Sequence, residues 1–133
     1  MLLFLPVHYI THRVNPASPE SPIYSVGPAE LDFEFVKLGL QQWPGRSWFL
    51  YAGLVACVAW HAAEGMQIIW NTWLRGSLGG WKSSLKSRSI TAIAVVVPVL
   101  SGLFAIWREP LMTLASSATR FEAAFQKSVL FRF

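Results

Sequence analysis

A histidine and a glutamate inside a long apolar stretch are the residues of this chain best placed to do chemistry. His61 and Glu64 are three residues apart, so a helix would bring them onto one face. A charged group at the centre of a membrane helix costs roughly 2.5–3.5 kcal/mol, and such groups usually face a partner, a ligand or a cofactor. Gly65 leaves the surface beside the His61 imidazole open to a packed helix or a flat macrocycle. His61 could ligate haem or donate to a quinone or lipid, but we favour a structural role in which His61 and Glu64 hydrogen-bond each other or another helix.

A second polar cluster, His8, His12 and Arg13, follows the apolar start of the chain. His8 and His12 are four residues apart and therefore share a helical face. That spacing permits metal binding, but a metal site needs more than two histidines, and we predict none. We expect the cluster to contact lipid headgroups, with Arg13 as an interfacial anchor or a phosphate contact.

A third group consists of cations only. The segment 75–88 contains Arg75, Lys82, Lys86 and Arg88 and no acidic residue. Each cation near an anionic membrane surface contributes about 1 kcal/mol, so we expect the four to contact lipid headgroups. The positive-inside tendency would place this segment in the cytosol.

The composition indicates a single membrane domain. The chain has 133 residues, of which 53% are hydrophobic and 14% charged, against about 25% charged in soluble domains. The cations flank apolar runs, so we expect no nucleic-acid partner, and the single cysteine, Cys57, allows no intrachain disulfide. The chain lacks a Gly-rich phosphate loop, a nucleophile elbow, an HExxH motif and a CxxC pair, so we do not expect an enzyme.

Two segments are long and apolar enough to span a bilayer, which needs about 20 residues. Residues 47–74 have tryptophan or tyrosine near both ends, as is typical of the two membrane interfaces. Residues 89–108 form the second span, which Pro98 should kink. Small side chains in the first span would let another helix approach closely. They are Ala52, Gly53, Ala56, Cys57, Ala59 and Ala63.

The other segments complete an all-α transmembrane helical bundle, with two full spans, a partial N-terminal membrane helix and amphipathic surface helices. Residues 1–13 look like the end of a membrane helix, so we expect the chain to be part of a longer protein. Residues 14–46 form a polar loop and a surface helix over 28–40, residues 75–88 form a basic loop, and 110–133 form an amphipathic tail.

We expect both surface helices to lie on the membrane by an apolar stripe. Leu31, Phe35 and Leu38 form the first stripe. The stripe of the tail consists of Leu111, Leu114, Ala118, Phe121, Phe125 and Val129, with Arg120, Lys127 and Arg132 beside it.

Four motifs resemble the membrane domain of the fungal mitochondrial adapter family. They are ITHRV at 10–14, GPAELDFEFVK at 27–37, YAGLV at 51–55 and WHAAEG at 60–65. The resemblance implies a non-enzymatic protein of the mitochondrial outer membrane that supports lipid homeostasis and contact between organelles. It also implies membrane lipids and lipid-transfer or contact-site proteins as partners, besides helix partners or a second copy. The Pro-x-Pro motif with which these adapters recruit a lipid-transfer protein does not occur here.

A more distant similarity is to the cytochrome b membrane subunits of succinate dehydrogenase and fumarate reductase. His12-Arg13-Val14 matches their His-Arg-Val motif, and His61 with Gly65 matches a later His-x-x-x-Gly. This similarity implies Arg13 near a quinone and His61 as a ligand of haem b. A Pro-rich loop follows Arg13 where the cytochromes continue into a membrane helix, and a second haem ligand at comparable depth is lacking. We therefore expect no cofactor and keep a haem- or quinone-binding anchor as the alternative.

Overall fold

The computed structural model describes residues 3–80 and 84–132, and this part of the chain contains helices and loops without a strand. The prediction of an all-α membrane fold is confirmed. The elements in chain order are α1 (Phe4–Tyr9) with a π-helical continuation (Ile10–Val14), α2 (Phe33–Gln42), α3 (Pro44–Ile69) with a π-helical continuation (Trp70–Leu74), α4 (Arg75–Leu78), α5 (Leu85–Arg108), α6 (Ala115–Gln126) and a 3-10 turn (Val129–Phe131).

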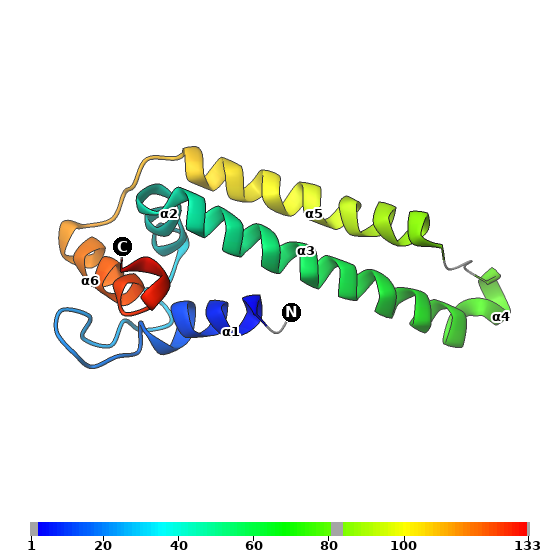
Figure 1. The fold of residues 1–133 in the computed structure, drawn as a ribbon, viewed down its shortest axis with the longest axis horizontal. Helices are drawn as coiled ribbons and strands as arrows, with labels where there is room; N and C mark the ends of the chain where they lie inside the picture. The colour runs from blue at the N-terminus through cyan, green and yellow to red at the C-terminus, as the bar shows by residue number, and fades with distance from the viewer. Residues whose placement is uncertain (1–2, 81–83, 133) are drawn as a thin grey trace.

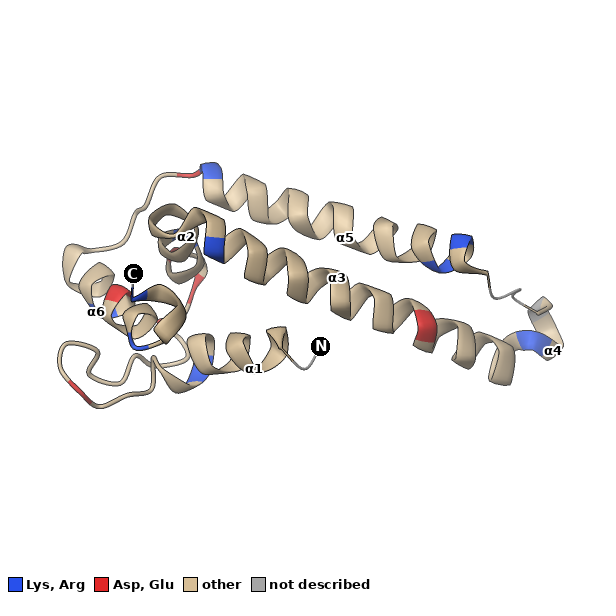
Figure 2. Ribbon diagram, in the orientation of Figure 1, with Lys and Arg blue, Asp and Glu red and all other residues tan. Residues whose placement is uncertain are grey.

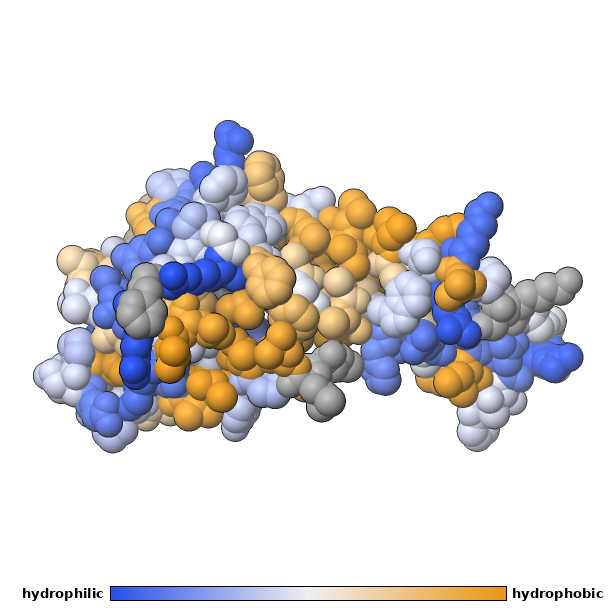
Figure 3. Space-filling view, viewed as in Figure 1, coloured by the Kyte–Doolittle hydropathy of each residue, from blue (hydrophilic) through white to orange (hydrophobic). Residues whose placement is uncertain are grey.

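Two long helices form an antiparallel hairpin that is long and apolar enough to cross a membrane (Figure 1). The first runs through α3 and its continuation over Pro44–Ser77, and the second is α5. Only 6% of the most apolar window of α5 is buried in the chain, so its apolar side chains face outward, as in a helix surrounded by lipid. The space-filling view shows this apolar surface in the middle of the hairpin (Figure 3).

Small side chains set the distance between the two spans. Ala59 and Ala63 of α3 are buried against Ala92 of α5. Gly53 lies at a second contact, because a Cβ atom there would overlap the ring of Phe4 in α1. The small residues of the first span therefore allow two helices to pack closely against it: α5 at Ala59 and Ala63, and α1 at Gly53.

Charged residues lie near both ends of the hairpin and leave an uncharged stretch between them (Figure 2). The uncharged part of α3 lies between Arg46 and Glu64, and that of α5 lies between Arg88 and Arg108. At 1.5 Å per residue these stretches are about 27 Å and 30 Å long, which matches the ~30 Å hydrocarbon core of a bilayer. Because α3 and α5 run antiparallel, Glu64 and Arg88 mark one boundary of this core and Arg46 and Arg108 mark the other.

The segments that flank the hairpin pack together at one of its ends (Figure 1). We call this part, residues 15–43 and 109–132, the terminal module. The helix α1 runs from it alongside α3, where Phe4 packs at Gly53 (Figure 1). Phe35 of α2 and Phe125 of α6 stack at its centre with ring centroids 4.4 Å apart. Gly39 lets the rings lie against the α2 backbone, since a Cβ atom there would come within 2.7 Å of Phe125. The other buried core residues are Ile23, Val26, Leu38, Phe121, Ala124 and Phe131.

Ion pairs join the two flanks within the terminal module. Arg120 donates to Glu30 at 2.6 Å, and Lys127 donates to Glu20 at 2.8 Å. Both pairs connect the end of the chain around α6 to the loop before α2. Lys127 lowers the pKa of Glu20, and the Gly27 backbone N–H together with Arg120 lowers the pKa of Glu30. Lys37, whose side chain is only 5% exposed, pairs with Glu34 and connects α2 to the end of α5 through the Pro110 carbonyl at 3.2 Å.

The two predicted surface helices differ from expectation in their bounds and in what they contact. The helix expected over 28–40 begins at Phe33, because the Asp32 carboxylate caps it by accepting from the Glu34 backbone N–H at 2.8 Å. Its apolar face does not lie on a membrane surface, since Phe35 and Leu38 are buried in the protein core. The apolar stripe of the tail does not lie on one surface either, because only some of its residues pack into the protein. Phe121 and Phe125 are buried, whereas Leu114 and Val129 are 75% and 66% exposed.

The basic segment 75–88 is also largely helical rather than a loop. Arg75 belongs to α4, which continues the first span, and Lys86 and Arg88 belong to the first turn of α5. Ser84 caps α5 by accepting from the Ser87 backbone N–H at 3.1 Å, so the second span begins before the expected residue 89. Lys82 lies outside the described residues.

Candidate functional site

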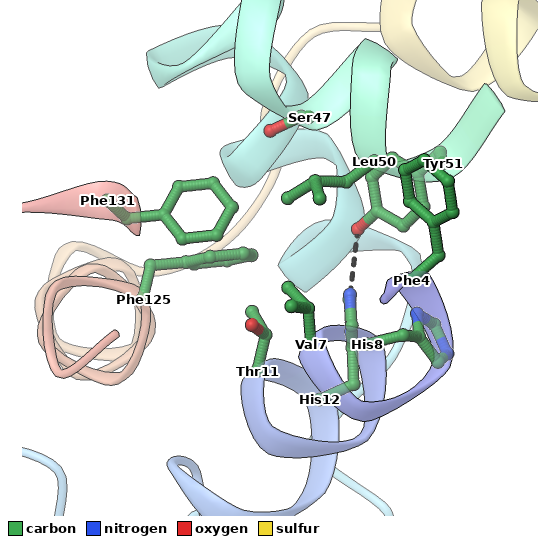
Figure 4. A pocket seen from close by; sticks show the side chains of 10 residues that line it. All are labelled: Phe4, Val7, His8, Thr11, His12, Ser47, Leu50, Tyr51, Phe125 and Phe131. Atoms are coloured by element: carbon green, nitrogen blue, oxygen red, sulfur yellow. Dashed lines mark hydrogen bonds between the residues drawn. The ribbon is translucent and has the colours of Figure 1, made fainter. Parts of the chain in front are cut away.

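The first candidate site is formed by His8, His12 and Tyr51, which we call the histidine cluster (Figure 4). The helical start of the chain, which runs from α1 into Ile10–Val14, carries both histidines against the first turns of α3. The His12 Nε2 atom lies 3.0 Å from the Tyr51 hydroxyl, and the two histidine rings are 4.5 Å apart. The sequence expectation that this cluster contacts headgroups fits Arg13, which is exposed, better than His12, which faces the protein.

His12 is held in an aromatic environment that favours its neutral form. Its ring meets Phe35 edge-on at 5.3 Å and Phe125 at 6.1 Å. Burial lowers the pKa of His12 to about 3, and the positive charges of His8 and Arg13 act in the same direction. A neutral imidazole has one N–H donor and one acceptor, so it can exchange a hydrogen bond with the Tyr51 hydroxyl in either direction.

A small cavity lies beside this hydrogen bond and contains an unsatisfied hydroxyl. The cavity has a free volume of about 20 Å³, enough for one water molecule, and its lining includes Thr11, His12, Ser47 and Tyr51 (Figure 4). The Thr11 Oγ1 atom is buried without a hydrogen-bond partner in the described residues. The arrangement can hold a water molecule, and it gives the histidine cluster a structural character.

We expect the histidine cluster to make stability depend on pH in a defined window. The unfolded chain binds a proton at His12 near pH 6.5, whereas the folded chain does not until about pH 3. Stability should therefore be constant above about pH 6.5 and fall as the pH is lowered below it. The pKa of Glu20, Glu30 and Glu34 lies below the ordinary 4.5, so these carboxylates lose their contribution only at lower pH.

Thermal unfolding of the detergent-solubilised protein between pH 7.5 and pH 5 measures this dependence. His12→Gln cannot be protonated at that position, so it should flatten most of the decline between about pH 6.5 and pH 5. His8, with a pKa lowered by burial and by Arg13, titrates beside it, so His8→Gln serves as the matched comparison. Equal slopes for the wild type and His12→Gln would show that His12 is not the group responsible.

The second candidate site is an ion pair between the spans. The Arg88 guanidinium of α5 donates to the Glu64 carboxylate of α3 at 3.3 Å, and the Trp60 indole N–H donates to the same carboxylate at 3.2 Å. His61 is exposed, and no described residue hydrogen-bonds it. Three residues turn a helix by about 300°, which leaves His61 and Glu64 about 60° apart around the axis. The structure therefore turns Glu64 toward α5 and His61 toward the surroundings, and the two do not pair.

A buried glutamine next to this ion pair was missed in the sequence. Gln67 is only 4% exposed, and within the described part of the chain its Nε2 atom has no hydrogen-bond partner. It lines an open groove between the spans together with Glu64, Asn71 and Arg88. The spacing of Gln67 could have revealed it, because a polar residue three positions after Glu64 in an apolar run lies on the same helical face as Glu64. Gly65, by contrast, faces open space, since nothing lies within 4 Å of a Cβ atom built there.

The described residues do not provide His61 with a second haem ligand. His12 contacts Tyr51, which is ten residues before His61 and therefore about 15 Å away along α3. Two axial histidines must bind one iron from opposite faces of the macrocycle, so His12 and His61 do not fit this role. Within the described ranges, no group of three or more histidine, cysteine, aspartate or glutamate side chains could hold a metal ion.

A two-span helical hairpin, whose flanking segments pack together at one end, defines an integral membrane domain. The family described as MDM10-complementing protein 1, transmembrane domain, has a sequence model that matches residues 3–116, so this chain belongs to that family. The predicted resemblance to the adapter family is thereby confirmed. No curated protein and no solved structure matches the chain, and the similarity to cytochrome b subunits finds no support.

Proposed function

We propose that this chain is the membrane domain of a non-enzymatic adapter in the mitochondrial outer membrane, and that the adapter supports lipid homeostasis and contact between organelles. The family supports this proposal, because its description names a protein that complements MDM10. The resemblance noted in the sequence associates such proteins with fungal mitochondria and with lipid-transfer proteins.

The observation that carries the proposal is the folded module at one end of the hairpin. An adapter needs a membrane anchor and a rigid part that emerges on one side of the membrane. Here both flanks contribute to that part, because Arg120 and Lys127 of the tail bind Glu30 and Glu20 of the N-terminal loop. The core of the module is filled by packed aromatic and aliphatic side chains, with Phe35 and Phe125 stacked at its centre. A rigid module on a membrane anchor supports a role in holding a partner protein at the membrane.

The partners that we propose are membrane lipids around the spans and lipid-transfer or contact-site proteins at the terminal module. Helix partners or a second copy of the chain would contact the outward face of α3. His61 and Gly65 lie on this outward part of the helix, where the described chain leaves space around Gly65. A hydrogen bond from His61 to such a helix partner would give it the structural role expected from the sequence.

Expression of the chain in cells that lack MDM10 tests this proposal. We expect a tagged chain to colocalise with an outer-membrane marker, to resist alkaline carbonate extraction and to restore growth and mitochondrial shape. Phe125→Ala, which breaks the terminal module, should remain in the membrane without restoring either. Residence in a different membrane would contradict the proposed location, and correct residence of the wild type without rescue would contradict the adapter function.

A further inference from the structure

An open polar groove lies between α3 and α5 near the connection that joins them. Its free volume is about 440 Å³, more than ten times the ~30 Å³ that a water molecule occupies in the liquid. It is therefore large enough for a small polar ligand. The groove is lined by Glu64, Gln67, Ile68, Asn71, Thr72 and Arg88.

Gln67 gives this groove an unused hydrogen-bond donor. Gln67 is only 4% exposed, yet its Nε2 atom has no hydrogen-bond partner among the described residues. Buried amide groups in folded proteins are almost always hydrogen-bonded, because leaving one unpaired costs free energy. An acceptor oxygen from outside the chain would satisfy it.

A negatively and a positively charged side chain lie close together in the groove. The Glu64 carboxylate and the Arg88 guanidinium lie 3.3 Å apart and both line it. About a third of the Arg88 side chain and two fifths of the Glu64 side chain are exposed, so a ligand can reach each of them. A ligand that carries an anionic and a cationic group complements such a pair without leaving a net charge at the site.

The depth of the groove identifies the class of ligand. Arg88 is twenty residues from Arg108 along α5, a distance of about 30 Å, so the two arginines bracket the hydrocarbon core. Gln67, Asn71 and Thr72 lie beyond Glu64 on the side away from this core. The groove thus begins at the hydrocarbon boundary and extends into the headgroup layer, where Trp70 and Trp73 of the same helix also fit.

We propose that this groove binds the headgroup of a zwitterionic phospholipid. The phosphodiester accepts hydrogen bonds from the Gln67 amide and the Arg88 guanidinium, and the ammonium group lies toward Glu64. Ile68, which is 67% exposed beside the groove, contacts the start of the acyl chains. This assignment needs only that the chain spans a bilayer, so it stands apart from the adapter role.

Native mass spectrometry of the detergent-solubilised, delipidated chain tests the assignment. The probes are phosphatidylcholine, phosphatidylethanolamine, phosphatidic acid and diacylglycerol with identical acyl chains. We expect the two zwitterionic lipids to bind about tenfold more tightly than diacylglycerol, which lacks the phosphate that charge-assisted hydrogen bonds require. Phosphatidic acid should bind less tightly than either, because its net negative charge meets Glu64.

Two variants separate headgroup recognition from general lipid adhesion. Gln67→Leu keeps the approximate volume but removes the donor, and it should reduce the preference for zwitterionic lipids over diacylglycerol by roughly threefold, the loss of one hydrogen bond. Glu64→Gln keeps the shape but removes the negative charge, so it should weaken the zwitterionic lipids and strengthen phosphatidic acid. Gln42→Leu is the matched control, because Gln42 is exposed at the opposite end of the hairpin and its replacement should change nothing.

Circular dichroism melting shows whether each variant is folded. If Gln67→Leu fails to fold, the reversal of lipid preference by Glu64→Gln decides the question alone. The assignment is overturned if the wild type binds phosphatidylcholine no better than diacylglycerol, or if a folded Gln67→Leu binds like the wild type. A wild-type preference for phosphatidic acid over both zwitterionic lipids would also overturn it.

Discussion

Replacing Phe125 by alanine is expected to lower the free energy of unfolding of the terminal module by about 3–5 kcal/mol, the range for a buried phenylalanine. The ring is 1% exposed and stacks on Phe35 with centroids 4.4 Å apart. It also contacts Trp43 at 5.6 Å and Phe131 at 5.1 Å. Its removal leaves a cavity between α2 and α6 that the neighbouring rings, held in place by the surrounding backbone, cannot fill. Near-ultraviolet circular dichroism during denaturant unfolding in micelles measures the loss.

Phe33→Ala is the matched control for this experiment. Phe33 begins α2 but is 69% exposed, so its truncation should change stability by no more than about 0.5 kcal/mol. The far-ultraviolet signal of the two spans should survive in both variants, because α3 and α5 contact each other outside the module. Equal losses for Phe125→Ala and Phe33→Ala would contradict the described core.

Replacing Ala63 by leucine is expected to force the two spans apart and to destabilise the hairpin by about 1–3 kcal/mol, the usual cost of overpacking. Ala63 is 1% exposed and lies with Ala59 against Ala92. In a membrane the spans are held together by close packing rather than by the hydrophobic effect, so a bulky side chain at this contact removes the main attraction. Thermal unfolding in lipid nanodiscs, followed by protection from protease, measures the change.

Ala62→Leu provides the comparison for the interface variant. Ala62 is the preceding residue of α3 and is exposed, so the added side chain should meet lipid and leave the hairpin intact. It has the same change in volume, hydrophobicity and helix propensity as Ala63→Leu. A destabilisation by Ala62→Leu that equals that of Ala63→Leu would place the contact with α5 on a different face.

Length and hydropathy were sufficient to predict the two spans, because both properties are local. Signals in the local sequence mark the outer ends of the spans, since Pro44 begins the first helix and Pro110 follows the end of the second at Arg108. The start of the second span was predicted four residues too late. Its first turn, Leu85–Arg88, is polar and cationic, and it is helical because Ser84 caps it.

The role of the apolar stripes could not be predicted, because a stripe faces lipid and protein with the same pattern. Phe121 and Phe125 pack on α2, whereas Val129 in the same stripe is exposed. The difference depends on where α2 lies in space, more than eighty residues earlier in the chain. The same limit explains Glu64, whose partner Arg88 is twenty-four residues away and was expected to contact headgroups.

His8 and His12 were recognised as a polar pair from their residue types, but their environment was not. The spacing of His8 and His12 correctly indicates a shared face, since their rings lie 4.5 Å apart. The hydrogen bond between His12 and Tyr51 joins residues thirty-nine positions apart, and the sequence marks Tyr51 as an interfacial aromatic residue within the YAGLV motif, not as a partner of His12. Local spacing reveals a cluster within one helix, but not the residue that a second helix adds.

The most direct test of the account is the sidedness of the chain in intact mitochondria. Single cysteines are introduced as Ser21→Cys, Ser116→Cys and Ser77→Cys on a Cys57→Ser background, and each is exposed to a large polyethylene-glycol maleimide. Ser21 and Ser116 belong to the terminal module, and Ser77 ends the first span at the opposite end of the hairpin. We expect the two module variants to react alike and Ser77→Cys to show the opposite reactivity, until detergent makes all three reactive. Reaction of Ser77→Cys together with either module variant before lysis would contradict a two-span membrane domain.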